Sequence, residues 1–270
     1  MTTTAIKLPI LRLGDGIDSP ELQDEVKLLQ TKIGLLADNI DGKFGSVTEI
    51  IVKRFQQSKG LLTDGIVGQE TWSILLDEPV EVFLPYSLTV GSFNIERIVS
   101  SIKFPTIRKY ARKSIPLILQ ECESNGVTER SQIAYILATA QHESHLGELM
   151  VELASGNAYE NRKDLGNTQP GDGAKFKGRG FVQITGRKNY TDWSTRLSIN
   201  LIENPEKAAS DEIAAKILVQ GMRNGTFTGL KLGNFISSSK HDFVNARKII
   251  NGLDRAKEIA AIAENFLQVL

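Results

Sequence analysis

The sequence has few of the residues that would mark a disulfide-bonded or membrane-spanning protein. Cys122 is the only cysteine among 270 residues, so no disulfide can form within the chain. Its position in the apolar run 115–123 indicates a small buried side chain rather than a nucleophile. No apolar run approaches the roughly 20 residues of a membrane-spanning helix, and the first residues do not resemble a typical signal peptide. We therefore expect a protein made in the cytoplasm, with no membrane insertion.

The chain also lacks net charge, with 32 Lys and Arg against 32 Asp and Glu. The balance is uneven, because residues 1–78 hold 8 basic and 12 acidic side chains and the remainder holds 24 and 20. No Lys/Arg cluster dominates either part, which argues against nucleic-acid binding. With 41% hydrophobic and 24% charged residues, the composition is typical of a globular protein of one large domain or two smaller ones.

The stretch Ile133–Glu152 places a carboxylate on an apolar helix face. A 3.6-residue period aligns four apolar side chains, and the same face then reaches Glu143; the four are Ile133, Ile136, Leu137 and Ala140. A carboxylate there is costly unless it is paired, hydrogen-bonded or protonated, and burial raises a glutamate's pKa, which suits a general acid. The alternative is a surface glutamate whose apolar neighbours only look aligned.

A second carboxylate, Glu152, follows nine residues later. On an unbroken helix the two would lie roughly 13–14 Å apart on opposite faces. Gly147 offers a helix stop, after which the chain could fold back and bring Glu152 towards Glu143. Two facing carboxylates are what glycoside hydrolysis requires.

The N-terminal part contains an internal repeat. The segment DGKFGSVT at 41–48 recurs 23 residues later as DGIVGQET at 64–71. Asp-Gly favours a tight turn, and each unit is expected to open a helix. Together with an apolar helical pattern over Glu21–Ile33, these features predict a compact three-helix domain over residues 15–78. Residues 79–93 contain two prolines and no helical period, which predicts a linker with short extended pieces.

Residues 94–270 are predicted to be mainly α-helical. Helices are expected at 95–103, 107–122, 189–197, 211–223, 242–250 and 254–270. Residues 153–178 are rich in Gly, Asn, Asp and Pro, which predicts a long ordered loop, and such loops are usually functional.

The second part resembles the family 19 glycoside hydrolases, which include chitinases and phage endolysins. The resemblance rests on the triplet HES at 142–144, the pair VE at 151–152, the segment GRGFVQIT at 178–185 and the triplet ING at 250–252. It implies a lysozyme-like, α-rich catalytic domain with a substrate cleft. The plant members have longer loops and disulfides, so the similarity is to the compact microbial members.

The resemblance also implies roles for individual residues. Glu143 matches the family's general acid and Glu152 its base, while Thr185 matches a hydroxyl that holds the attacking water. Gln183 and Asn251 match residues that hydrogen-bond the sugar, and we add His142 and Tyr190 as substrate contacts. Tyr159 and Tyr190 could each stack on a sugar ring or belong to the core. Rivals for the base lie in the loop; they are Glu160, Asp164 and Asp172.

The N-terminal part resembles the peptidoglycan-binding domain found at the ends of many cell-wall hydrolases. The matching residues are the two repeat units, Phe55-Gln56 and Thr71-Trp72. We expect Phe55 and Trp72 to pack the core and polar loop residues near the repeated turns to contact the ligand.

These features predict a two-domain hydrolase that needs no cofactor and acts as a monomer on a cell-wall polysaccharide after release or export. It is expected to cleave β-1,4 glycosidic bonds of peptidoglycan by an inverting mechanism, with chitin as the alternative substrate. A zinc peptidase or amidase is a rival, but the histidine spacing in HESH differs from the His-Glu-x-x-His motif, so no metal site is predicted. A non-catalytic wall-binding protein is the third possibility.

Overall fold

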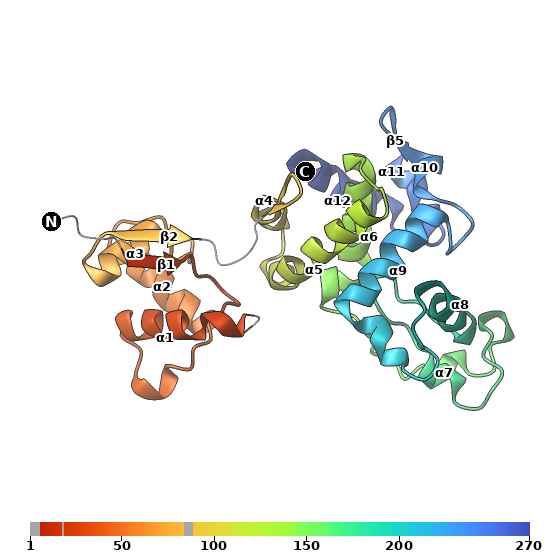
Figure 1. The fold of residues 1–270 in the computed structure, drawn as a ribbon, viewed down its shortest axis with the longest axis horizontal. Coiled ribbons are helices and arrows are strands. Elements are labelled where there is room, and N and C mark those ends of the chain that lie inside the picture. The colour runs from red at the N-terminus through yellow and green to blue at the C-terminus, as the bar shows by residue number, and fades with distance from the viewer. Residues whose placement is uncertain (1–5, 18, 84–88) are drawn as a thin grey trace. The chain divides into compact units, whose positions relative to one another are not determined.

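The computed structural model describes residues 6–17, 19–83 and 89–270. The chain divides into two compact units, Met1–Leu88 and Thr89–Leu270 (Figure 1). Each unit has an apolar core of its own. In the described part of the chain, no helix combines the length and the apolar character needed to span a bilayer.

The first unit is a three-helix domain with a small sheet. Its helices are α1 (Gln23–Lys32), α2 (Ser46–Ser58) and α3 (Gln69–Leu76), with 3₁₀ turns η1 (Pro20–Leu22) and η2 (Ala37–Asn39). They enclose an apolar core whose buried residues are Leu8, Leu11, Leu22, Val26, Leu29, Phe44, Val52, Val67, Trp72 and Val80. Trp72 is fully buried, as predicted, and its indole N–H donates to Pro9 O at 2.8 Å. Phe55, predicted to be core, is only partly buried, and Phe44 fills that role instead.

Both repeat units form the turns that the sequence predicts. Gly42 and Gly65 have positive φ angles of 73° and 77°, a conformation that glycine adopts without steric cost. Three residues after each of these glycines comes the N-cap glycine of a helix, Gly45 for α2 and Gly68 for α3. Each repeat is therefore one turn followed by one helix.

The segment predicted as a linker, 79–93, belongs largely to the two units. Strand β2 (Val80–Phe83) pairs in parallel with β1 (Ile6–Pro9). Strands β3 (Thr89–Val90) and β4 (Phe93–Asn94) pair with each other in the second unit. The predicted limits of 15–78 and 94–270 are therefore too narrow for the units observed, while residues 84–88 lie outside the described residues.

The second unit is mainly α-helical. Its helices are α4 (Ile95–Ser100), α5 (Pro105–Ser124), α6 (Arg130–Ser144), α7 (Asp172–Lys175), α8 (Arg187–Leu197), α9 (Asp211–Asn224), α10 (Leu232–Phe235), α11 (Phe243–Ala246) and α12 (Ala256–Val269). Its 3₁₀ turns are η3 (His145–Gly147), η4 (Asn157–Tyr159), η5 (Lys163–Leu165), η6 (Pro205–Ala209) and η7 (Arg247–Ile249). A short hairpin pairs β5 (Ile236–Ser237) with β6 (Lys240–His241).

Helix α6 lies at the centre of the second unit. Helices α5, α9 and α12 all contact it, and every side chain from Ile133 to Ala140 is buried (Figure 1). The helix is therefore buried on all sides rather than along the single stripe that the sequence predicted. A second apolar cluster, which includes Phe176, Tyr190 and Trp193, supports the region of α7 and α8.

Helix α6 ends before the predicted stop at Gly147. Its last residue is Ser144, and His145, Leu146 and Gly147 then have φ angles of 51°, 56° and 114°. Two successive non-glycine residues with positive φ are uncommon. They reverse the chain directly beyond the helix, so Glu143 remains on its last turn.

Candidate active site

Glu143 is paired with an arginine that the sequence analysis did not identify. The Glu143 carboxylate forms a short ion pair with the guanidinium of Arg247, at the start of η7. The Arg247 side chain is 6% exposed and that of Glu143 20% exposed, and Arg247 Nε also donates to Asp254 O at 3.2 Å. The surroundings of Glu143 are therefore charged on one side, not purely apolar as predicted.

Arg247 left a signal in the sequence. It falls within the apolar stripe of the segment predicted as helix 242–250, just as Glu143 falls on the apolar face of α6. Opposite charges on two buried faces can neutralise each other, because a buried charge needs a partner. The sequence therefore contains the information that pairs Arg247 with Glu143.

Glu152 is held by a short antiparallel pairing with the GRG segment. Its backbone N–H donates to Gly178 O at 2.9 Å, and Gly180 N–H donates to Met150 O at 2.9 Å. The carboxylate accepts hydrogen bonds from Tyr159 O–H at 2.8 Å and from Gly178 N–H at 3.0 Å. The bond to Glu152 is the main cause that raises the pKa of Tyr159. Each carboxylate oxygen of Glu152 is thus held in place by one hydrogen bond.

Gly178 makes room for two of the predicted site residues. A Cβ atom at this position would lie 2.9 Å from Gln183 Oε1 and 3.2 Å from Glu152 Oε2. Only glycine avoids that contact, so the backbone at Gly178 can approach both side chains. The amide of Gln183 and the carboxylate of Glu152 consequently lie on the same side of this glycine.

The segment 179–184 forms a tight turn rather than a strand. Arg179 and Ile184 exchange two backbone hydrogen bonds of 3.2 and 3.0 Å, and Gln183 has a φ of 50°. Gln183 Nε2 donates to Leu149 O at 3.0 Å and to Gly180 O at 2.8 Å. The turn brings the Gln183 side chain back to Gly178 and Gly180. A regular strand with alternating side chains, as predicted, would not place it there.

Thr185 follows this turn directly. Its hydroxyl donates to Gln183 O at 2.9 Å, which leaves the hydroxyl oxygen able to accept a hydrogen bond. The structure therefore brings the Glu152 carboxylate and the Gln183 amide together at Gly178, and the Thr185 hydroxyl contacts the Gln183 backbone.

The remaining predicted substrate contacts are more scattered. His142 lines a groove of about 580 Å³ together with Phe104, Arg255 and Glu258. Burial lowers the pKa of His142, against the opposing effect of the Glu143 carboxylate. Asn251 is exposed, and its backbone N–H donates to Arg247 O at 3.0 Å.

Tyr190 does not contact substrate, and this prediction is wrong. Its side chain is fully buried, its O–H donates to Lys177 O at 2.8 Å, and its oxygen accepts from Arg179 Nη1 at 2.8 Å. Burial raises the pKa of Tyr190 to about 12. Its ring packs against that of Phe176, with 5.1 Å between the centroids, and its hydroxyl fixes Lys177 and Arg179 on either side of Gly178.

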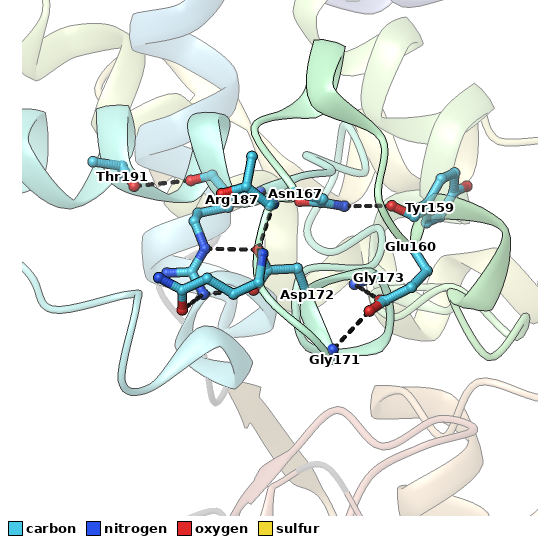
Figure 2. A network of polar contacts seen from close by, with 10 residues as sticks. Tyr159, Glu160, Asn167, Gly171, Asp172, Gly173, Arg187 and Thr191 are labelled. Carbon is cyan, nitrogen blue, oxygen red and sulfur yellow. Dashed lines mark hydrogen bonds and ion pairs between the residues drawn. The ribbon is translucent and has the colours of Figure 1, made fainter.

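The rival carboxylates of the loop hold the loop itself (Figure 2). Asp172 is buried and accepts from Arg187 Nε at 2.9 Å and from the N–H groups of Thr168 and Gln169 at 3.0 Å each. The hydrogen bond from Arg187 is the main cause that lowers the pKa of Asp172. A buried carboxylate with such partners is a poor proton acceptor.

Glu160 and Asp164 also have local partners. Glu160 accepts from Gly171 N–H and Gly173 N–H at 2.8 Å each, as Figure 2 shows. Asp164 is exposed and pairs with the neighbouring Arg162 at 2.8 and 2.6 Å, and that hydrogen bonding lowers its pKa. Asn167 connects this loop to the site, because its side chain donates to Tyr159 O and accepts from Arg187 N–H, at 2.8 Å each.

Both histidines of the HESH segment line the groove described above. Within it, His145 Nδ1 lies 3.0 Å from Glu148 Oε2. Within residues 6–17, 19–83 and 89–270, His, Cys, Asp and Glu side chains form no group of three or more arranged to hold a metal ion.

One comparison with known protein families matches a segment of the first unit. Residues 22–75 match the family described as "Putative peptidoglycan binding domain". A glycosyl hydrolase family 19 domain-containing protein of Haemophilus influenzae is 28% identical over 154 residues, which covers 45% of this chain and 76% of that protein.

Two solved structures are also similar. Chitinase C from Streptomyces griseus HUT6037 has 21% identity and a TM-score of 0.49, covering 67% of this chain and 78% of that one. A bacterial family 19 chitinase has 19% identity and a TM-score of 0.39, covering 68% and 87%. The chain therefore contains a segment similar to peptidoglycan-binding domains and is similar to a family 19 glycosyl hydrolase domain-containing protein, and it is a glycosidase.

Proposed function

We propose that the chain is a cell-wall hydrolase that cleaves β-1,4 glycosidic bonds of peptidoglycan, with Glu143 as general acid and Glu152 as general base. The observation that carries the proposal is the meeting of Glu152 and Gln183 at Gly178, with the Thr185 hydroxyl hydrogen-bonded to the Gln183 backbone. A carboxylate and an acceptor hydroxyl can hold one water between them, and the amide can bind a sugar substituent. The first unit supports peptidoglycan as the target through its family match.

In this mechanism a water attacks the anomeric carbon while the bond to the leaving sugar breaks. Glu152 takes a proton from the water, and Thr185 accepts its second hydrogen and orients it. Glu143 must first take up a proton in place of its ion pair with Arg247, and it then gives that proton to the leaving oxygen. Arg247 then stabilises the carboxylate that remains on Glu143, because an adjacent positive charge favours the charged form. The reaction inverts the anomeric configuration, as expected when water attacks directly.

Tyr159 keeps the base in place. Its hydroxyl donates to Glu152 Oε1, and its backbone carbonyl is held by buried Asn167. This contact joins the base to the loop 153–178, so an ordered loop is part of a competent site. We infer further that one chain forms the whole site, that a monomer acts, and that it meets the wall after release or export.

Chitin is the second candidate substrate, because two similar solved structures are chitinases. Purified peptidoglycan and chitin oligomers would be incubated with the full chain, and the release of reducing ends would be measured for both. We expect faster release from peptidoglycan. Faster release from chitin oligomers would reverse the choice, and activity lost to EDTA and restored by zinc would favour the peptidase or amidase instead.

A further inference from the structure

The first unit contains one polar node at each sequence repeat. In the first node, Gln30 Oε1 accepts from Gly42 N–H at 2.9 Å. Its Nε2 donates to Asp41 Oδ1 at 2.8 Å, to Lys43 O at 3.1 Å and to Thr48 Oγ1 at 3.3 Å. One buried glutamine therefore fixes both the turn and the start of α2.

The second node repeats the first atom by atom. Gln56 Oε1 accepts from Gly65 N–H at 2.9 Å. Its Nε2 donates to Asp64 Oδ1 at 3.0 Å, to Ile66 O at 2.9 Å and to Thr71 Oγ1 at 3.4 Å. The repeat in the sequence is thus a repeat of three-dimensional structure.

A groove opens beside each node. Groove A, of about 610 Å³, includes Gln30, Leu36, Asp41, Ser46, Thr48 and Ile51 in its lining. Groove B, of about 830 Å³, includes the repeat equivalents Gln56, Leu62, Asp64, Gln69, Thr71 and Ile74. The two grooves therefore arise from the same elements of the two repeats.

Both grooves present an exposed leucine and an acidic lining. Leu36 is 75% exposed and Leu62 is 77% exposed. A single exposed leucine needs no explanation. Here, however, an exposed leucine occupies the equivalent position in both repeats, and each of the two lines a groove. Each groove has two carboxylates, from Asp38 and Asp41 in groove A and from Asp64 and Glu70 in groove B, and groove A has one lysine, Lys43. Both linings are net negative.

We propose that grooves A and B are two equivalent binding sites for the stem peptides of peptidoglycan, so that one domain binds the wall at two points. The proposal rests on the peptidoglycan target proposed above. Stem peptides carry the methyl groups of alanines, which fit aliphatic linings, and the ammonium group of a diamino acid, which fits a negative groove. None of the described residues that line either groove is aromatic, whereas a glycan would call for flat aromatic surfaces on which sugar rings can pack.

Two sites on one rigid domain have a measurable consequence. Once one groove holds a stem peptide, a second peptide on the same wall is at high effective concentration for the other groove. Loss of either groove should therefore weaken wall binding to a similar extent, and loss of both should weaken it much more.

Binding to insoluble peptidoglycan would be measured with the full-length chain, with Glu143→Gln as background so that the wall stays intact. The variants are Leu36→Ser, Leu62→Ser and the pair together. Ile50→Ser is the matched control, because Ile50 is a 50% exposed residue of α2 outside the described lining of both grooves. Thermal unfolding would confirm that each variant is folded.

We expect each single groove variant to bind about tenfold more weakly and the double variant at least about 100-fold more weakly, with the control within about twofold of the background. A synthetic stem peptide with a free diamino-acid amine should compete for wall binding, and chitin oligomers should not. Loss at one groove only, no loss at either, or undiminished binding to glycan strands stripped of peptides would overturn the proposal. Hydrolysis of the wall would be measured separately with Glu143 restored. Wall hydrolysis by a chain whose groove variants bind normally would contradict this inference alone, whereas specific groove binding without hydrolysis by the Glu143 form would contradict the proposed enzyme activity alone.

Discussion

The loop 153–178 and the active site use carboxylates in opposite ways. In the loop, Glu160 binds amides 11 and 13 residues away, and Asp164 binds an arginine two residues away. In the site, Glu143 pairs with Arg247, 104 residues away, and Glu152 binds Gly178 N–H, 26 residues away. Glu160 and Asp164 therefore have partners within the loop, whereas Glu143 joins α6 to the region of η7 and Glu152 is bound by Tyr159 and Gly178 of the loop.

Glu143→Gln should break this comparison most strongly. The amide preserves the shape of the side chain but has no proton to give to the leaving oxygen. General acid catalysis is commonly worth about 10²–10⁴-fold, and we expect kcat on peptidoglycan to fall by about 1,000-fold while the thermal midpoint changes little. A variant that keeps more than about a tenth of the wild-type rate would show that Glu143 is not the acid.

Glu152→Gln tests whether the base is Glu152 or a carboxylate of the loop. Loss of the base should lower kcat by about 100-fold. Asp164→Asn is the control, because Asp164 is an exposed carboxylate with a local partner, and its rate should stay within about twofold of wild type. If a steady-state assay showed the large loss of kcat for Asp164→Asn and little loss for Glu152→Gln, the base would have to be assigned to the loop.

Asp172→Asn should affect stability more than chemistry. It removes the charge that pairs with Arg187, whose side chain is 22% exposed, and we expect a loss of about 1–3 kcal/mol in the free energy of unfolding at pH 7. Urea unfolding would measure the loss, and the rate on soluble substrate should fall by less than about tenfold.

The same variant has a defined pH dependence. The pKa of Asp172 is lowered in the folded state, so its contribution to stability is present above the ordinary aspartate value of about 4 and disappears as the pH falls through the folded value. The difference between wild type and Asp172→Asn should therefore shrink below about pH 4. An equal difference at pH 7 and pH 3 would mean that the ion pair does not account for it.

The repeats and most helices of the second unit could be predicted from the sequence because their causes are local. Asp-Gly turns, capping glycines and apolar periods act within a few residues, and α1, α5, α8, α9 and α12 lie close to where these signals place them. The strand pair β1–β2 could not be predicted, because it joins residues more than 70 positions apart.

The site was less predictable for the same reason. Glu143, Glu152 and the GRG segment were recognisable as motifs, yet the pairing with Arg247 depends on packing between α6 and the region of η7. Tyr190 was misassigned because an aromatic residue beside a motif has the same local pattern whether it faces a sugar or the core. The turn at Gln183 was missed because the alternation of Val182 to Thr185 suggests a strand, whereas the bridge from Arg179 to Ile184 closes a tight turn.

The most direct test of the central claim is the anomeric form of the first product. The account requires Glu152 to activate a water that Thr185 orients, while Glu143 protonates the leaving oxygen. NMR spectra of sugar freshly released from a β-linked substrate should therefore show the α-anomer first, before mutarotation. Initial release of the β-anomer would contradict the single-displacement mechanism and would require a nucleophile in place of the activated water.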